Sequence, residues 1–144
     1  MIFSKTSCIL EYFSKSEIET PLIPLYKAKI LVDTKKPVEA EKLLLPLEAA
    51  VKESEIQNLS DSYYSVLLQT KYPQNKWKDI PLVYEKISNP DKQAVYVISA
   101  YYYNKGDYKK VDSSTGELYA SALCRSGNYE DACKVYNRLG INNS

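Results

Sequence analysis

The sequence predicts an all-α protein. Apolar residues recur at spacings of three and four along most of the chain, which is the pattern of one buried helix face. The periodic segments are short, and turns that contain Gly, Pro or Asn separate them. The best-defined pair of helices extends from Thr115 to Asn142, with Ser126-Gly127-Asn128 as the turn between its members. We therefore expect a chain built from helical hairpins.

Prolines mark the starts of the N-terminal helices. A first helix is expected over residues 4–16, where the apolar residues have helical spacing. A second is expected over residues 20–33, because Thr20 can cap it and Pro21 suits the first helical position. Pro37 opens the third helix in the same way.

The helix that begins at Pro37 should be kinked further along. Pro46 has no N–H to donate to the carbonyl oxygen of Lys42, so the helix should bend there. A polar link at residues 54–58 follows, and the next helix is expected over residues 59–70.

Two further helices precede the last hairpin. One should begin near Asp79, with Pro81 in its first turn, and extend to about Ser88. The other is expected over residues 91–105 and should end in a turn at Gly106-Asp107-Tyr108.

The last hairpin has a physical reason for each of its residue types. Ala120 and Ala132 are small, which lets the two helices cross closely. Tyr129 and Tyr136 are expected to fill the space between neighbouring helices with large rings. Gly127 suits the left-handed conformation that ends a helix.

This hairpin resembles a tetratricopeptide repeat. Tyr119, Ala120 and Leu123 take the large, small and large places of the first helix, and Ala132 and Tyr136 take the small and aromatic places of the second. The resemblance implies a right-handed superhelical array of about four hairpins, with a leading N-terminal helix. Such an array would form a single domain over residues 1–144.

Composition excludes several classes of function. Nineteen basic and 18 acidic residues give a net charge of +1, so no charge excess points to nucleic acid or an anionic membrane. The chain has no histidine, only four isolated glycines and three scattered cysteines. We therefore predict no enzyme activity, no metal and no cofactor. The cysteine pattern and the lack of a long apolar run favour a cytosolic protein, with the nucleus as the alternative.

The resemblance also implies where a partner would bind. In tetratricopeptide arrays the first helix of each hairpin lines a concave groove that holds a protein or peptide. The groove candidates, which form a mixed apolar, aromatic and cationic wall, are Lys29, Val66, Gln69, Lys92, Tyr96, Tyr103, Asn104, Ser121, Cys124 and Arg125. The expected function is therefore a non-catalytic scaffold or adaptor in a multi-subunit complex.

Subclasses of the family give narrower expectations. Glu117-Leu118-Tyr119, Arg125 and the run 135–139 are similar to a repeat of the tetratricopeptide subunit of the eukaryotic signal recognition particle. A self-associating scaffold, as in subunits of the anaphase-promoting complex, is the alternative and implies a homodimer. A receptor for chaperone C-termini is disfavoured, because Leu25 stands where that subclass has lysine and Lys29 where it has asparagine. An RNA-contacting module is less favoured, since the lysines are scattered.

One repeat is too short. Gly106 and Gly127 hold the same place in successive turns, and 127 − 106 = 21, whereas the tetratricopeptide period is 34. A second helix is therefore missing after Gly106. One hypothesis is that a segment has been lost between about Lys109 and Ser114. The other is a degenerate repeat in which the loop over residues 107–115 makes the connection.

Overall fold

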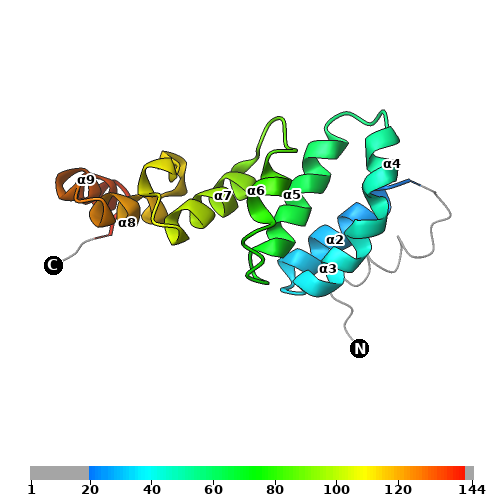
Figure 1. The fold of residues 1–144 in the computed structure, drawn as a ribbon, viewed down its shortest axis with the longest axis horizontal. Helices are drawn as coiled ribbons and strands as arrows, with labels where there is room; N and C mark the ends of the chain where they lie inside the picture. Colours follow the sequence, from blue (N-terminus) through cyan, green and yellow to red (C-terminus); the bar gives the residue numbers. More distant parts are fainter. Residues whose placement is uncertain (1–19, 142–144) are drawn as a thin grey trace. The chain divides into compact units, whose positions relative to one another are not determined.

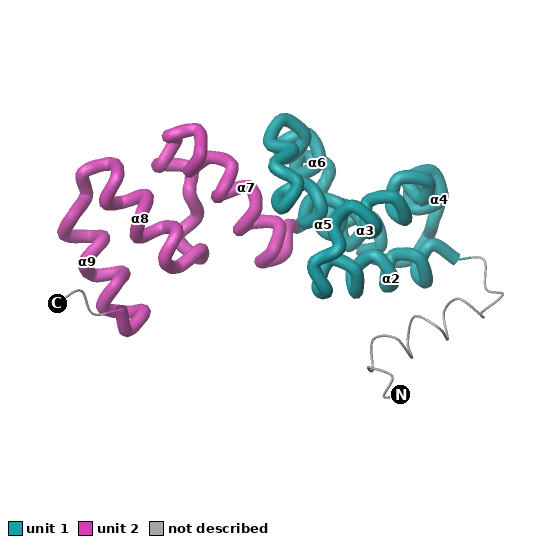
Figure 2. Tube along the Cα trace, turned by 90° about the horizontal axis from the view of Figure 1, so that it is seen from below, with its two compact units in different colours: residues 1–89 teal, residues 90–144 magenta. Residues whose placement is uncertain are grey.

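The computed structural model describes residues 20–141 (Figure 1). This part of the chain contains helices and turns and no β-strand, which confirms the all-α class. The chain divides into two compact units, residues 1–89 and 90–144 (Figure 2). The helix expected over residues 4–16 lies outside the described residues. The superhelix over residues 1–144 stays a prediction.

Unit 1 is organised around one central helix. Its helical segments are α2 (Leu22–Asp33), α3 (Pro37–Leu44), the 3-10 turn η1 (Leu45–Leu47), α4 (Glu48–Glu53), α5 (Leu59–Lys71) and α6 (Ile80–Tyr84). Helices α2, α3, α4 and α6 all pack against α5, and α2 also packs against α3. Every residue of α5 from Tyr63 to Leu68 is buried, as expected of a helix that is surrounded on all sides.

The predicted kink at Pro46 is confirmed. Helix α3 ends at Leu44, the chain passes through η1, and α4 then continues to Glu53. The link over residues 54–58 is confirmed as well, since α5 begins at Leu59. Proline's missing N–H accounts for the break, because the regular bonding of the helix cannot continue through it.

Helix α6 is shorter than predicted. It begins at Ile80, next to Asp79, but ends at Tyr84 rather than near Ser88. The carboxylate of Asp61 accepts hydrogen bonds from the backbone N–H groups of Ser88 and Asn89, at 2.9 and 3.0 Å. These bonds fix the end of the segment in a non-helical path, which sequence periodicity does not reveal.

The described residues of unit 2, 90–141, contain three helices and two short 3-10 turns. They are α7 (Lys92–Asn104), the 3-10 turns η2 (Tyr108–Lys110) and η3 (Ser113–Thr115), α8 (Glu117–Arg125) and α9 (Tyr129–Arg138). Helix α8 packs against α9 and also contacts α7, η2 and η3.

Of the residues predicted to pack between α8 and α9, some are buried or half-buried and one is exposed. Ala120 and Ala132 are both 0% exposed, which confirms the close crossing. Tyr136 is half-buried, and its hydroxyl lies 3.2 Å from Ser121 Oγ. Tyr129 is 67% exposed, so the prediction that it fills space between helices is wrong. It is the first residue of α9 and lies about one turn before the buried Ala132.

One pair of backbone hydrogen bonds recurs at the helix ends marked by Lys35, Asn75, Gly106, Gly127 and Gly140. Lys35, Gly106 and Gly127 have φ values of 63°, 81° and 88°. The following residues, Lys36, Asp107 and Asn128, have ψ values of 63°, 68° and 64°. At Gly127 the N–H bonds the carbonyl of Cys124 at 3.1 Å, and the next N–H bonds that of Leu123 at 2.8 Å. The predicted left-handed helix stop at Gly127 is therefore confirmed.

Residues 107–115 connect the end of α7 to α8. Val111 is buried, and the N–H of Asp112 donates to Oγ of the buried Ser99 at 3.0 Å. Val111 is extended, which stops η2 from growing into a helix. The loop over residues 107–115 thus connects α7 to α8. A lost segment and a degenerate repeat both stay hypotheses for the short period.

Candidate functional site

The predicted groove residues of unit 1 do not form a cluster of contacts. Lys29 is exposed on α2. Gln69 is half-buried, and its side-chain amide donates to the carbonyl oxygen of Ser65 at 3.2 Å. Val66 is 5% exposed, so its assignment to a binding surface is wrong. Its side chain belongs to the core because α5 is enclosed by four other helices.

The remaining candidates lie in unit 2, and most are accessible. Lys92, Tyr96 and Asn104 are exposed on α7. Ser121 and Cys124 are half-buried on α8; Cys124 has a free thiol. These side chains share a unit, but exposure alone does not make them a site.

Tyr103 and Arg125 are brought together by the fold. The ring of Tyr103 packs edge to face against Tyr108, with centroids 5.4 Å apart. The guanidinium carbon of Arg125 lies 6.0 Å from the centre of the Tyr103 ring. Two of the ten predicted residues, one from α7 and one from the end of α8, therefore meet as an aromatic and cationic pair.

A second series of contacts adjoins the first along the chain. Lys105 Nζ lies 5.0 Å from the centre of the Tyr101 ring, and Lys110 Nζ lies 5.2 Å from that of Tyr102. The two rings are themselves 5.3 Å apart in an edge-to-face arrangement. These contacts form two clusters at the end of α7: Tyr101, Tyr102, Lys105 and Lys110 in one, and Tyr103, Tyr108 and Arg125 in the other. Tyr101 and Tyr103 are two positions apart on the helix, so their side chains point to different sides of it. We call the two clusters together the tyrosine–cation surface.

Local structure explains why these residues gather. The turn at Gly106 reverses the chain directly after α7, so η2 returns beside the end of that helix. Tyr108 and Lys110 lie on η2, and α8 packs against both α7 and η2. Sequence reasoning missed Tyr101, Tyr102, Lys105, Tyr108 and Lys110. The signal for them was the run of three tyrosines followed by lysines at the helix end.

The cations of this surface differ in how far they are neutralised. Lys110 Nζ forms an ion pair with Asp107 at 3.4 Å. Within residues 20–141, Lys105 and Arg125 form no ion pair with a carboxylate. Hydrogen bonding to Tyr103 raises the pKa of the Arg125 guanidinium, and hydrogen bonding to Tyr101 raises the pKa of the Lys105 amine. Both groups are exposed and charged at neutral pH.

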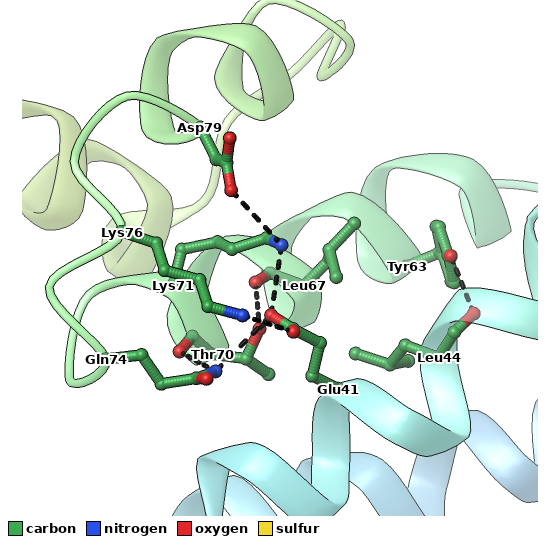
Figure 3. A network of polar contacts seen from close by, with 9 residues as sticks. All are labelled: Glu41, Leu44, Tyr63, Leu67, Thr70, Lys71, Gln74, Lys76 and Asp79. Atoms are coloured by element: carbon green, nitrogen blue, oxygen red, sulfur yellow. Dashed lines mark hydrogen bonds and ion pairs between the residues drawn. The ribbon is translucent and has the colours of Figure 1, made fainter.

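Unit 1 contains a different polar cluster, centred on Glu41 (Figure 3). The Glu41 carboxylate accepts from Lys76 Nζ at 2.6 Å and from the Gln74 amide at 3.3 Å, and it pairs with Lys71 Nζ at 3.0 Å. Lys71 also lies 3.6 Å from Asp79. Glu41 and Lys71 are both buried.

The Glu41 cluster has the character of a structural link. Burial by itself raises the pKa of the Glu41 carboxyl, but hydrogen bonds from Lys76 and Lys71 and their charges outweigh it, and the net pKa is lowered. The carboxylate is thus ionised, and its oxygens are occupied by partners within the chain. It ties α3 to the end of α5 and to the loop before α6.

No protein-family description, curated protein or solved structure was found to match the chain. Among residues 20–141, no three His, Cys, Asp or Glu side chains are placed to hold a metal ion. In the same part of the chain, every helix is too short or too polar to cross a membrane.

Proposed function

We propose that the chain is a non-catalytic module that binds another protein, and that the tyrosine–cation surface of unit 2 is where it does so. The observation that supports this is the gathering of four half-buried tyrosines and three exposed cations from α7, η2 and α8. Tyrosine and arginine are the residue types most enriched at the energetic centres of protein interfaces. The rings offer apolar area, and the cations offer directional hydrogen bonds.

We further propose that the hairpins are tetratricopeptide-like and that the module serves as an adaptor in a multi-subunit complex. The recurrence of one pair of backbone hydrogen bonds at the five helix ends described above supports a repeated unit. The fully buried Ala120 and Ala132 support the close helix crossing that the family requires. A complex similar to the signal recognition particle is one proposed setting.

Affinity capture from a cell extract, followed by mass spectrometry, tests the proposed function. The full chain should retain a specific set of proteins, and Tyr103→Ala or Arg125→Glu should reduce their recovery. Arg138→Glu is the matched control, because Arg138 is the last residue of α9 as Arg125 is of α8, and both are exposed. Equal capture by all variants would show that unit 2 does not bind through this surface.

A further inference from the structure

We propose that the tyrosine–cation surface recognises an acidic segment of a partner protein that passes around the end of α7, with side-chain carboxylates of that segment bound by Arg125 in one cluster and by Lys105 in the other. The inference rests on the proposed function and names the chemistry of the partner. The inference depends on the charge of the surface and on the contacts that hold its cations in place.

The first argument is charge complementarity. Within residues 20–141, Arg125 and Lys105 have no carboxylate partner, and each lies over a tyrosine ring instead. Hydrogen bonds to tyrosine occupy some of the N–H donors of Arg125 and Lys105, but a neutral tyrosine does not offset their positive charge. The guanidinium group presents a planar set of donors that matches a carboxylate in two-point contact. A carboxylate from a partner protein would therefore supply the ion-pair partner that Arg125 and Lys105 lack within residues 20–141.

The second argument is that these cations are already positioned. Tyr103 is held edge to face against Tyr108, 5.4 Å away, and Arg125 is held over Tyr103. Lys105 lies over Tyr101, which is its neighbour one turn earlier on α7. Side chains that are fixed before binding lose less conformational entropy when a ligand arrives. A surface prepared in this way favours a ligand with acidic groups at a few defined points.

The third argument favours carboxylates over a nucleic acid. Binding to a phosphate backbone depends on many cations in a row, whereas the chain has a net charge of +1 and Lys110 is paired with Asp107. Single-stranded nucleic acids also stack bases on open aromatic faces. Here the rings are half-buried, and Tyr101, Tyr102 and Tyr103 each have a cation over the ring. Little ring surface is left for a base.

Fluorescence anisotropy with defined probes tests the proposal on the full chain. The first probe is a fluorescein-labelled peptide of alternating Glu and Leu, blocked at both ends. The second is the same peptide with Gln in place of Glu, and the third is a single-stranded RNA of mixed sequence and similar length. The variants are Arg125→Glu and Lys105→Glu. Their matched controls are Arg138→Glu and Lys109→Glu, which change the charge equally at exposed positions without a ring contact in the described residues.

We expect the Glu peptide to bind and the Gln peptide to bind at least about tenfold more weakly, because the contacts are charge-assisted. Arg125→Glu and Lys105→Glu should each weaken binding of the Glu peptide by about fivefold to tenfold, and the controls by less than about twofold. Added salt should weaken binding by the parent chain, because the groups are exposed.

Three results would overturn the proposal. Equal binding of the Glu and Gln peptides, both weakened by Arg125→Glu, would remove the preference for acid while leaving a protein-binding surface. Binding of the RNA in preference to both peptides, lost in Arg125→Glu, would overturn the proposed function as well. Absence of binding by the Glu peptide would contradict the acidic partner alone, since the capture experiment tests the proposed function separately. Circular dichroism of each variant shows whether the helices are retained.

Discussion

Two lysines, one in each unit, have opposite environments. In unit 1 the Lys71 side chain is 11% exposed and lies between the carboxylates of Glu41 and Asp79, at 3.0 and 3.6 Å. In unit 2 Lys105 is exposed and lies over the ring of Tyr101. Even Lys86, which lies over Tyr64 in unit 1, is 3.8 Å from a carboxylate oxygen of Glu48.

This difference distinguishes charged side chains that stabilise the fold from charged side chains that are accessible to a partner. A buried cation must have a carboxylate, because the desolvation cost of an unpaired one is large. An exposed cation over a ring has no such requirement, and its contribution to stability is small. We therefore expect substitutions in the Glu41 cluster to affect folding, and substitutions in the tyrosine–cation surface to affect binding.

Glu41→Gln should cause the largest loss of stability. It leaves Lys71 buried with only Asp79 as a carboxylate partner, and should lower the free energy of unfolding by about 2–4 kcal/mol. Urea titration followed by the fluorescence of Trp77, the single tryptophan, reports on unit 1. Glu48→Gln is the control, because its ion pairs are more exposed and should cost less than about 1 kcal/mol. Equal effects of the two substitutions would contradict the structural role of Glu41.

Ala132→Leu should destabilise unit 2 by an intermediate amount. Ala132 is 0% exposed where α9 packs on α8, so the added volume should cost about 1–3 kcal/mol. Far-ultraviolet circular dichroism during urea titration measures the loss. Cys133→Leu introduces the same side chain at the exposed neighbouring position and should change stability by less than about 0.5 kcal/mol. A melt unchanged by Ala132→Leu would show that the α8–α9 hairpin is not packed as described.

Acid should remove the difference between the parent chain and Glu41→Gln. The pKa of Glu41 is lower in the folded state than its ordinary value of 4.5, so its contribution is present above that value and is lost as pH falls through the folded pKa. Once Glu41 is protonated, Lys71 of the parent chain also lacks an ionised carboxylate at position 41, as it does in Glu41→Gln. Urea titrations of both proteins at neutral and at acid pH should converge on the acid side. If the free energies of unfolding of the two proteins differ by the same amount at neutral and at acid pH, the ionised state of Glu41 is contradicted.

Arg125→Glu should have the smallest effect on folding. The side chain is exposed at the end of α8, so the free energy of unfolding should change little. Thermal melts of Arg125→Glu and Arg138→Glu should therefore agree closely. A large loss confined to Arg125→Glu would assign Arg125 to the stability of unit 2 rather than to a binding surface.

Sequence patterns predicted the local features of the fold well. Ala120 and Ala132 are both 0% exposed, as expected for small residues at a helix crossing. Local hydrogen bonding and steric restriction act within a few residues, so Gly127 and Pro46 could be interpreted from their immediate neighbours. The non-helical path after α6 could not, because the hydrogen bonds from Ser88 and Asn89 to Asp61 span 27 and 28 positions of sequence.

The polar contacts between side chains were the part of the structure that the sequence predicted least well. Glu41 meets Lys76 across 35 positions of sequence, and nothing in its helical spacing distinguishes it from a solvated glutamate. Tyr103 and Arg125 were among the predicted binding residues, but their contact depends on how α8 packs against α7. Val66 was assigned to a surface because the face of a helix is ambiguous when the helix is buried all round.

The location of binding can be measured by nuclear magnetic resonance. The ¹⁵N-labelled full chain would be titrated with the Glu-containing peptide while the backbone amide shifts are followed. We predict that the largest shifts fall on residues 101–110 and on the end of α8 around Arg125, with little change in α2 to α6. Shifts concentrated in α2 to α6, or no shifts at saturating peptide, would contradict a binding surface in unit 2.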